Sequence, residues 1–125
     1  MKTTLNHLHH QHTDWLRELD FYKIELKVLT ERLAEVASAN TALPVMQQVE
    51  HFQNRFVLLN EQLDVQMHEV KLAEKALQEK VKSMPEHIDQ KAIQPNEKLH
   101  ADVSYLFKNI ADTRFEFNGF LAKTL

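Results

Sequence analysis

A heptad repeat of mostly apolar residues runs through the first part of the chain, from residue 5 to residue 36. Its steps alternate between three and four residues, and residues spaced in this way lie along one side of an α-helix. The repeat therefore predicts a long helix over about residues 4–39 that packs against other helices along one stripe. The repeating positions are Leu5, Leu8, His12, Trp15, Leu19, Tyr22, Leu26, Leu29, Leu33 and Val36, and His12 is the one strongly polar member.

The same spacing returns twice further along the chain and predicts two more long helices, over about residues 42–82 and 96–123. Ser83 lies three residues before Glu86, which is the spacing of a capping box and favours a short helix over residues 85–93. Pro95 is then expected to open the last long helix. The repeating positions are Val49, Phe52, Phe56, Leu59, Leu63, Gln66, Val70, Ala73, Leu77, Lys80 and Met84, followed by Leu99, Val103, Leu106, Ile110, Thr113, Phe117, Phe120 and Thr124.

The connection between the first two predicted helices is a few residues long, which forces the helices to run antiparallel. A single glycine and three prolines leave little turn material for a β fold. We therefore predict an all-α fold in a single domain over residues 1–125. The predicted architecture is an elongated up-down-up bundle of three long antiparallel helices with coiled-coil packing, and the short helix lies in its second connection.

Composition narrows the classes of function. The formal charge of −3 at pH 7 gives no general attraction to nucleic acid or to an anionic membrane surface. No segment approaches the roughly 20 apolar residues needed to cross a bilayer, and the first residues lack the apolar core of a secretory signal. The chain has no cysteine, so disulfide and zinc-thiolate chemistry are excluded. We expect a cytoplasmic protein with no nucleic-acid or membrane partner.

Three apolar residues, Phe21, Ile24 and Val28, lie off the repeat on the side of the first helix opposite Leu19 and Leu26. One interpretation is that they fill the interior of a tightly wrapped bundle. The other is that they contact a second subunit, because exposed contiguous apolar residues usually mark an interaction surface. Further off-repeat apolar residues are Leu58, Val65 and Leu72 on the second helix and Phe115 on the third.

Histidines crowd near the start of the chain, and His9 and His12 share a helix face through their three-residue spacing. In the predicted bundle the start of the first helix lies beside the start of the third, which brings Glu97 and His100 close to them. A glutamate and a histidine three apart on one helix can both bind one metal ion. The sequence thus offers His9, His12, Glu97 and His100 as candidate ligands of a divalent metal. The competing interpretation makes His12 a repeat position whose ring shares its proton with a polar neighbour.

His68 suggests a different chemistry. It lies opposite the repeat on the second helix, with Lys71 one turn later, and this combination resembles histidine phosphotransfer domains, which are helical bundles of similar size. Those domains usually carry a glycine directly after the lysine, where this chain has Leu72. Glu69, next to the histidine, would also repel a phosphoryl group.

Three runs of sequence, over residues 12–23, 49–56 and 116–121, resemble uncharacterised small bacterial helical-bundle proteins with no assigned activity. This resemblance implies an all-α fold and carries no activity, cofactor or site residue. The leading hypothesis is a non-enzymatic bundle that acts through protein–protein contacts, most simply as a homodimer. A metal-binding bundle and a phosphotransfer protein that uses His68 are the alternatives.

Overall fold

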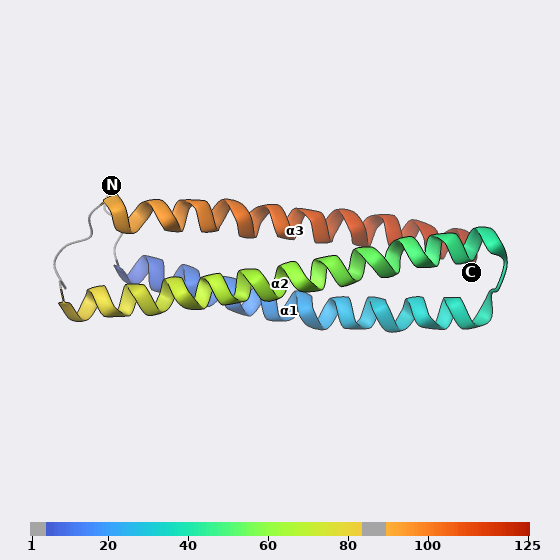
Figure 1. The fold of residues 1–125 in the computed structure, drawn as a ribbon, viewed down its shortest axis with the longest axis horizontal. Coiled ribbons are helices and arrows are strands. Elements are labelled where there is room, and N and C mark those ends of the chain that lie inside the picture. Colours follow the sequence, from blue (N-terminus) through green and yellow to red (C-terminus); the bar gives the residue numbers. More distant parts are fainter. Residues whose placement is uncertain (1–4, 84–89) are drawn as a thin grey trace.

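The computed structural model describes residues 5–83 and 90–125, with side chains for residues 5–82 and 96–125. Three helices account for nearly all of them: α1 spans Leu5–Ala39, α2 spans Leu43–Ser83 and α3 spans Gln90–Thr124. The helices lie along one common axis and form a rod (Figure 1). No strand occurs in the described part of the chain. The predicted all-α bundle of three long helices is therefore confirmed.

The second connection differs from the prediction. α3 begins at Gln90 and continues through residue 96, where the last helix was expected to start, so Pro95 lies within α3 and not at its beginning. Proline has no amide hydrogen, and α3 consequently lacks one backbone hydrogen bond in its second turn. Of the predicted short helix over residues 85–93, residues 85–89 lie outside the described part, and residues 90–93 belong to α3.

The predicted heptad stripes form the core. Most repeat positions of the three helices are buried, and the largest fully buried side chains include Leu19, Leu63 and Phe117. Burial of a leucine or phenylalanine side chain stabilises a fold by about 1.5–3 kcal/mol. We call the buried repeat positions of the three helices the buried seam. On α1 the seam comprises Leu8, His12, Trp15, Leu19, Leu26, Leu29, Leu33 and Val36.

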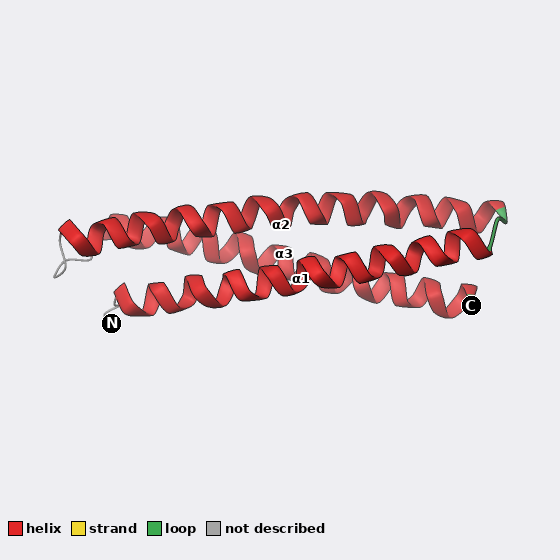
Figure 2. Cartoon of the chain, turned by 90° about the horizontal axis from the view of Figure 1, so that it is seen from below, coloured by secondary structure: helices red, strands yellow, loops and turns green. Residues whose placement is uncertain are grey.

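Side-chain contacts show which parts of the helices lie side by side. His9 on α1 contacts Glu74 on α2, and Lys23 on α1 contacts Asp64 on α2, so the start of α1 lies beside the later part of α2. A second view of the rod shows α2 along one edge and α1 crossing in front of α3 (Figure 2). Neither described segment contains a helix that is long and apolar enough to pass through a bilayer.

The chain turns between α1 and α2 over residues 40–42, where the side-chain oxygen of Asn40 accepts a hydrogen bond from the backbone N–H of Ala42 at 3.2 Å. Close to this turn, four phenylalanine rings pack together. The ring of Phe117 lies 5.2 Å from Phe52 and 5.2 Å from Phe56, measured between centroids and edge to face, and Phe120 lies 5.3 Å from Phe52. We call these four residues the aromatic cluster.

Candidate functional site

A hydrogen-bonded group of polar side chains lies at the other end of the rod and joins all three helices. His12 is buried in the seam of α1 with 3% of its surface exposed. Its Nδ1 lies 2.8 Å from Oε1 of Glu74 on α2, and its Nε2 lies 2.8 Å from Oδ1 of Asn96 on α3. His9 contacts the second oxygen of the same carboxylate through its own Nδ1. We call His9, His12, Glu74 and Asn96 the polar cluster.

Glu74 is the centre of the polar cluster. Partial burial acts to raise the pKa of its carboxyl group, because a charge is less well solvated away from water. Hydrogen bonds from His12, Gln78 and His9 act in the opposite direction, and the net result is a pKa below the ordinary value of 4.5. Glu74 is therefore ionised at neutral pH, and its two oxygens accept hydrogen bonds from two histidines and one glutamine.

The contacts of His12 fix the position of its ring. A carboxylate oxygen faces Nδ1, and an amide oxygen faces Nε2. The orientation of the Asn96 amide is set by its nitrogen, which donates to Oε1 of Gln11 at 2.8 Å. The ring of His12 is thus held between an oxygen atom of α2 and an oxygen atom of α3, and it links all three helices.

The structure places the four predicted metal ligands as follows. His9 and His12 lie together, but the carboxylate that bonds to both of them is Glu74, whereas Glu97 is exposed. His100 is exposed, with its ring 5.7 Å from the ring of Trp15. Within residues 5–83 and 90–125, no three or more histidine, aspartate or glutamate side chains are arranged to hold a metal ion.

Glu74 was missed because its position in the sequence is unremarkable. It follows the repeat position Ala73 and has the appearance of a solvent-facing charge. A signal was nevertheless available: His9 and Glu74 are nearly equidistant from the turn between Ala39 and Leu43, and residues equidistant from a helical hairpin turn lie side by side. Counting outward from the turn would have identified Glu74 as the neighbour of the histidines.

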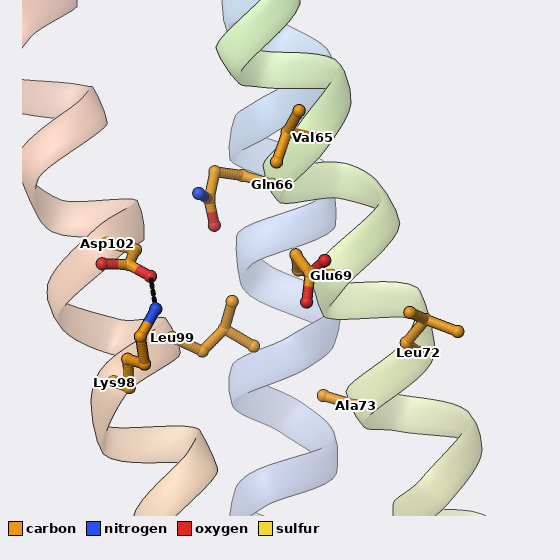
Figure 3. Close-up of a pocket in the computed structure, with 8 residues that line it drawn as sticks. All are labelled: Val65, Gln66, Glu69, Leu72, Ala73, Lys98, Leu99 and Asp102. Carbon is orange, nitrogen blue, oxygen red and sulfur yellow. Dashed lines mark hydrogen bonds and ion pairs between the residues drawn. The ribbon is translucent and has the colours of Figure 1, made fainter.

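A groove of about 540 Å³ runs between α2 and α3 (Figure 3). Gln66 extends from α2 toward α3, and its side-chain oxygen is buried without a hydrogen-bond partner in the described structure. Lys98 and Asp102 form an ion pair along the α3 side at 2.9 Å, and this contact raises the pKa of the exposed lysine. The groove is lined by charges of both signs, and nothing in it identifies a ligand.

His68 lies on the outer surface of α2 and is exposed. No hydrogen bond or ion pair within the described residues orients its ring, and Leu72, where a phosphotransfer domain usually has glycine, is 48% exposed. Within residues 5–83 and 90–125, no hydrogen-bonded base or acid therefore accompanies this histidine.

The outer side of α1 carries the three off-repeat apolar residues. Phe21 is 58% exposed, Ile24 is 60% exposed and Val28 is 48% exposed, although Leu19 and Leu26 on the same helix are buried. Residues spaced by three and four lie one above another on a helix, so the three side chains form one line. We call them the α1 stripe. Their exposure means that the bundle does not use them as core.

Comparison with protein-family models, with curated proteins and with solved structures finds no match. No enzyme family or homologue is found for this chain. The α1 stripe and the polar cluster must therefore be interpreted from their own geometry.

Proposed function

We propose that the chain is a non-enzymatic protein that acts through protein–protein contacts, with self-association of an up-down-up rod as the simplest form of that function. The observation that supports it is the α1 stripe, in which an aromatic and two branched aliphatic side chains on one helix face are 48% to 60% exposed. Contiguous exposed apolar side chains favour association, because contact removes them from water.

The choice of α1 rests on how closely its exposed apolar residues follow one another along one line. On α2 the line of off-repeat residues Leu58, Val65 and Leu72 has one member every seven residues, and on α3 the exposed Tyr105 and Phe115 lie ten residues apart. On α1 the three exposed residues fall within eight residues of sequence and include an aromatic ring, which is the side-chain type enriched at the centres of interfaces.

The test is to replace Ile24 with glutamate and compare sedimentation of the variant with that of the wild type. Association would have to desolvate the new carboxylate, so we expect the variant to remain monomeric at concentrations where the wild type associates. Helix content should not change, because Leu19 and Leu26 of the buried seam are untouched. Leu58→Glu on α2, at a similarly exposed position, is the matched control and should associate like the wild type. A wild-type protein that is monomeric at high concentration would contradict self-association.

A further inference from the structure

The charges around the α1 stripe follow a pattern that determines how a second copy could approach. Arg17, Ile24 and Glu31 are spaced by seven residues and so lie in one line along the helix. Arg17 and Glu31 are both exposed. Opposite charges therefore lie two turns before and two turns after the isoleucine.

Two further pairs repeat this arrangement on the flanks of the stripe. Asp20 and Lys27 share the flank toward α2, where Lys27 lines a groove together with Val57. Glu18 and Arg32 share the other flank, on the side of Glu25, which pairs with Arg114 of α3. All four are exposed, and none has an ion-pair partner within residues 5–83 and 90–125. Asp20 lies four residues before Ile24 and Lys27 three residues after it, whereas Glu18 lies six before and Arg32 eight after. In both pairs the two charges are opposite.

Two copies of a helix with this charge pattern are complementary when one is rotated by 180° about an axis perpendicular to the helices. In an antiparallel pair related by a two-fold axis at Ile24, each residue before the axis faces the residue on the same flank of the other copy that lies nearly as far beyond the axis. Phe21 then lies against the second copy's Val28, and Arg17 against its Glu31. On the flanks, Asp20 faces Lys27, and Glu18 faces Arg32.

A parallel arrangement of the same two surfaces would fail on charge. It would set Arg17 against Arg17 and Glu31 against Glu31 on the central line, and like charges in contact oppose association. Glu25 lies near the proposed axis and would face Glu25 of the second copy. Within its own chain it is already ion-paired with Arg114 at 2.7 Å. That contact reduces the repulsion between the two Glu25 carboxylates in the antiparallel arrangement.

We propose that the partner of the α1 stripe is a second copy of this chain, bound through antiparallel pairing of α1 with α1 and centred on Ile24. This inference rests on the proposed function and adds the identity, direction and register of the contact. From Arg17 to Arg32 the pairing spans about 22 Å of helix. One helix pair of that length is expected to bury less surface than a standard interface, which buries about 800 Å² per partner. We therefore expect a weak dimer, and added salt should weaken it further.

The test uses charge reversal in trans. Arg17→Glu places two like-charged pairs in the dimer, and so does Glu31→Arg, so each variant alone should raise the dissociation constant about 10-fold. Mixed in equal amounts, the two variants should form a heterodimer, because every reversed residue then faces an opposite charge. Analytical ultracentrifugation of each variant, of the mixture and of the double variant gives the four constants. The double variant restores all pairs and should associate like the wild type.

Cross-linking provides a second measurement that does not depend on charge. The chain has no cysteine, so Phe21→Cys and Val28→Cys each introduce the sole thiol. A disulfide requires the two Cα atoms to lie about 4.4–6.8 Å apart. Under oxidation the mixed proteins should form a disulfide between Phe21→Cys of one copy and Val28→Cys of the other. Either variant alone should cross-link poorly, because the thiols of the two copies in its homodimer would be offset by about 10 Å along the helix. Phe115→Cys, which is exposed on α3, is the control.

The outcomes separate this inference from the proposed function. A wild-type dimer that Ile24→Glu abolishes, combined with a charge-reversed mixture that associates no better than either variant alone, would overturn the antiparallel register and leave self-association intact. Efficient cross-linking of Phe21→Cys with itself would point to parallel pairing and would also overturn the register. A monomeric wild type would overturn both proposals. Recovery of association in the mixture, together with the mixed disulfide, is the result we expect.

Discussion

The end of the rod that carries the α1–α2 turn is packed with phenylalanine rings, whereas the opposite end is closed by a buried histidine that is hydrogen-bonded to a carboxylate and an amide. Apolar packing is nondirectional and insensitive to pH, so the aromatic cluster should supply stability over a wide range of conditions. Hydrogen bonds to a charged group require fixed geometry and a fixed protonation state. The polar cluster should therefore hold the three helices in one register at the cost of sensitivity to acid.

The largest loss of stability should come from a substitution in the aromatic cluster. Phe117→Ala removes a fully buried ring that contacts Phe52 and Phe56, and the lost transfer free energy plus the cavity should lower the free energy of unfolding by about 3–5 kcal/mol. Phe115→Ala is the matched control, with the same chemistry two residues away on α3 at 81% exposure, and should change stability by less than about 0.5 kcal/mol. Urea unfolding followed by circular dichroism measures both. Equal losses would mean that α3 has been assigned the wrong buried face.

A smaller loss of stability, which depends on pH, should come from a substitution in the polar cluster. Glu74→Gln removes the carboxylate that accepts hydrogen bonds from His9 and His12, and it should cost about 1–3 kcal/mol at neutral pH. Since folding lowers the pKa of Glu74, its contribution is complete above the ordinary value of 4.5 and is lost as the pH falls through the lower folded pKa.

The measurement is the difference in unfolding free energy between wild type and Glu74→Gln at several pH values from neutral to about pH 3. The difference should be constant at first and shrink toward zero in acid. Phe117→Ala, measured over the same range, should show a constant difference, because no titrating group is changed. A difference for Glu74→Gln that grows on acidification would contradict the proposed role of its carboxylate.

The smallest effect should come from added zinc. In the polar cluster, Nδ1 of His9 and both ring nitrogens of His12 already face hydrogen-bond partners, so metal binding would have to break the bonds that hold Glu74 and Asn96. We expect equimolar zinc to leave the thermal midpoint of untagged protein unchanged. Because a ligand that binds the folded state must stabilise it, a rise that is lost in a His9→Ala, His12→Ala double variant would show a metal site at this end.

The sequence by itself determined the helices and their buried sides. Leu19, Leu63 and Phe117 were identifiable as core because a heptad repeat is a local property, fixed by the spacing of apolar residues along one helix. The same repeat identified Phe21, Ile24 and Val28 as lying away from the seam. It could not decide whether another helix covers them, because that depends on where α2 and α3 lie around α1.

The tertiary structure alone decided which polar groups meet. The carboxylate at His12 is Glu74, more than sixty residues away in the sequence, and not Glu97. Contacts of this kind depend on the register between helices, and a shift of one residue turns a side chain by about 100° about its helix axis and away from its partner. The start of α3 at Gln90 was likewise outside the reach of local signals, since Pro95 is a typical helix opener but is tolerated here within the second turn. Heptad spacing fixes which side of each helix is buried, but the partner of a buried polar group follows only from how the three helices are aligned.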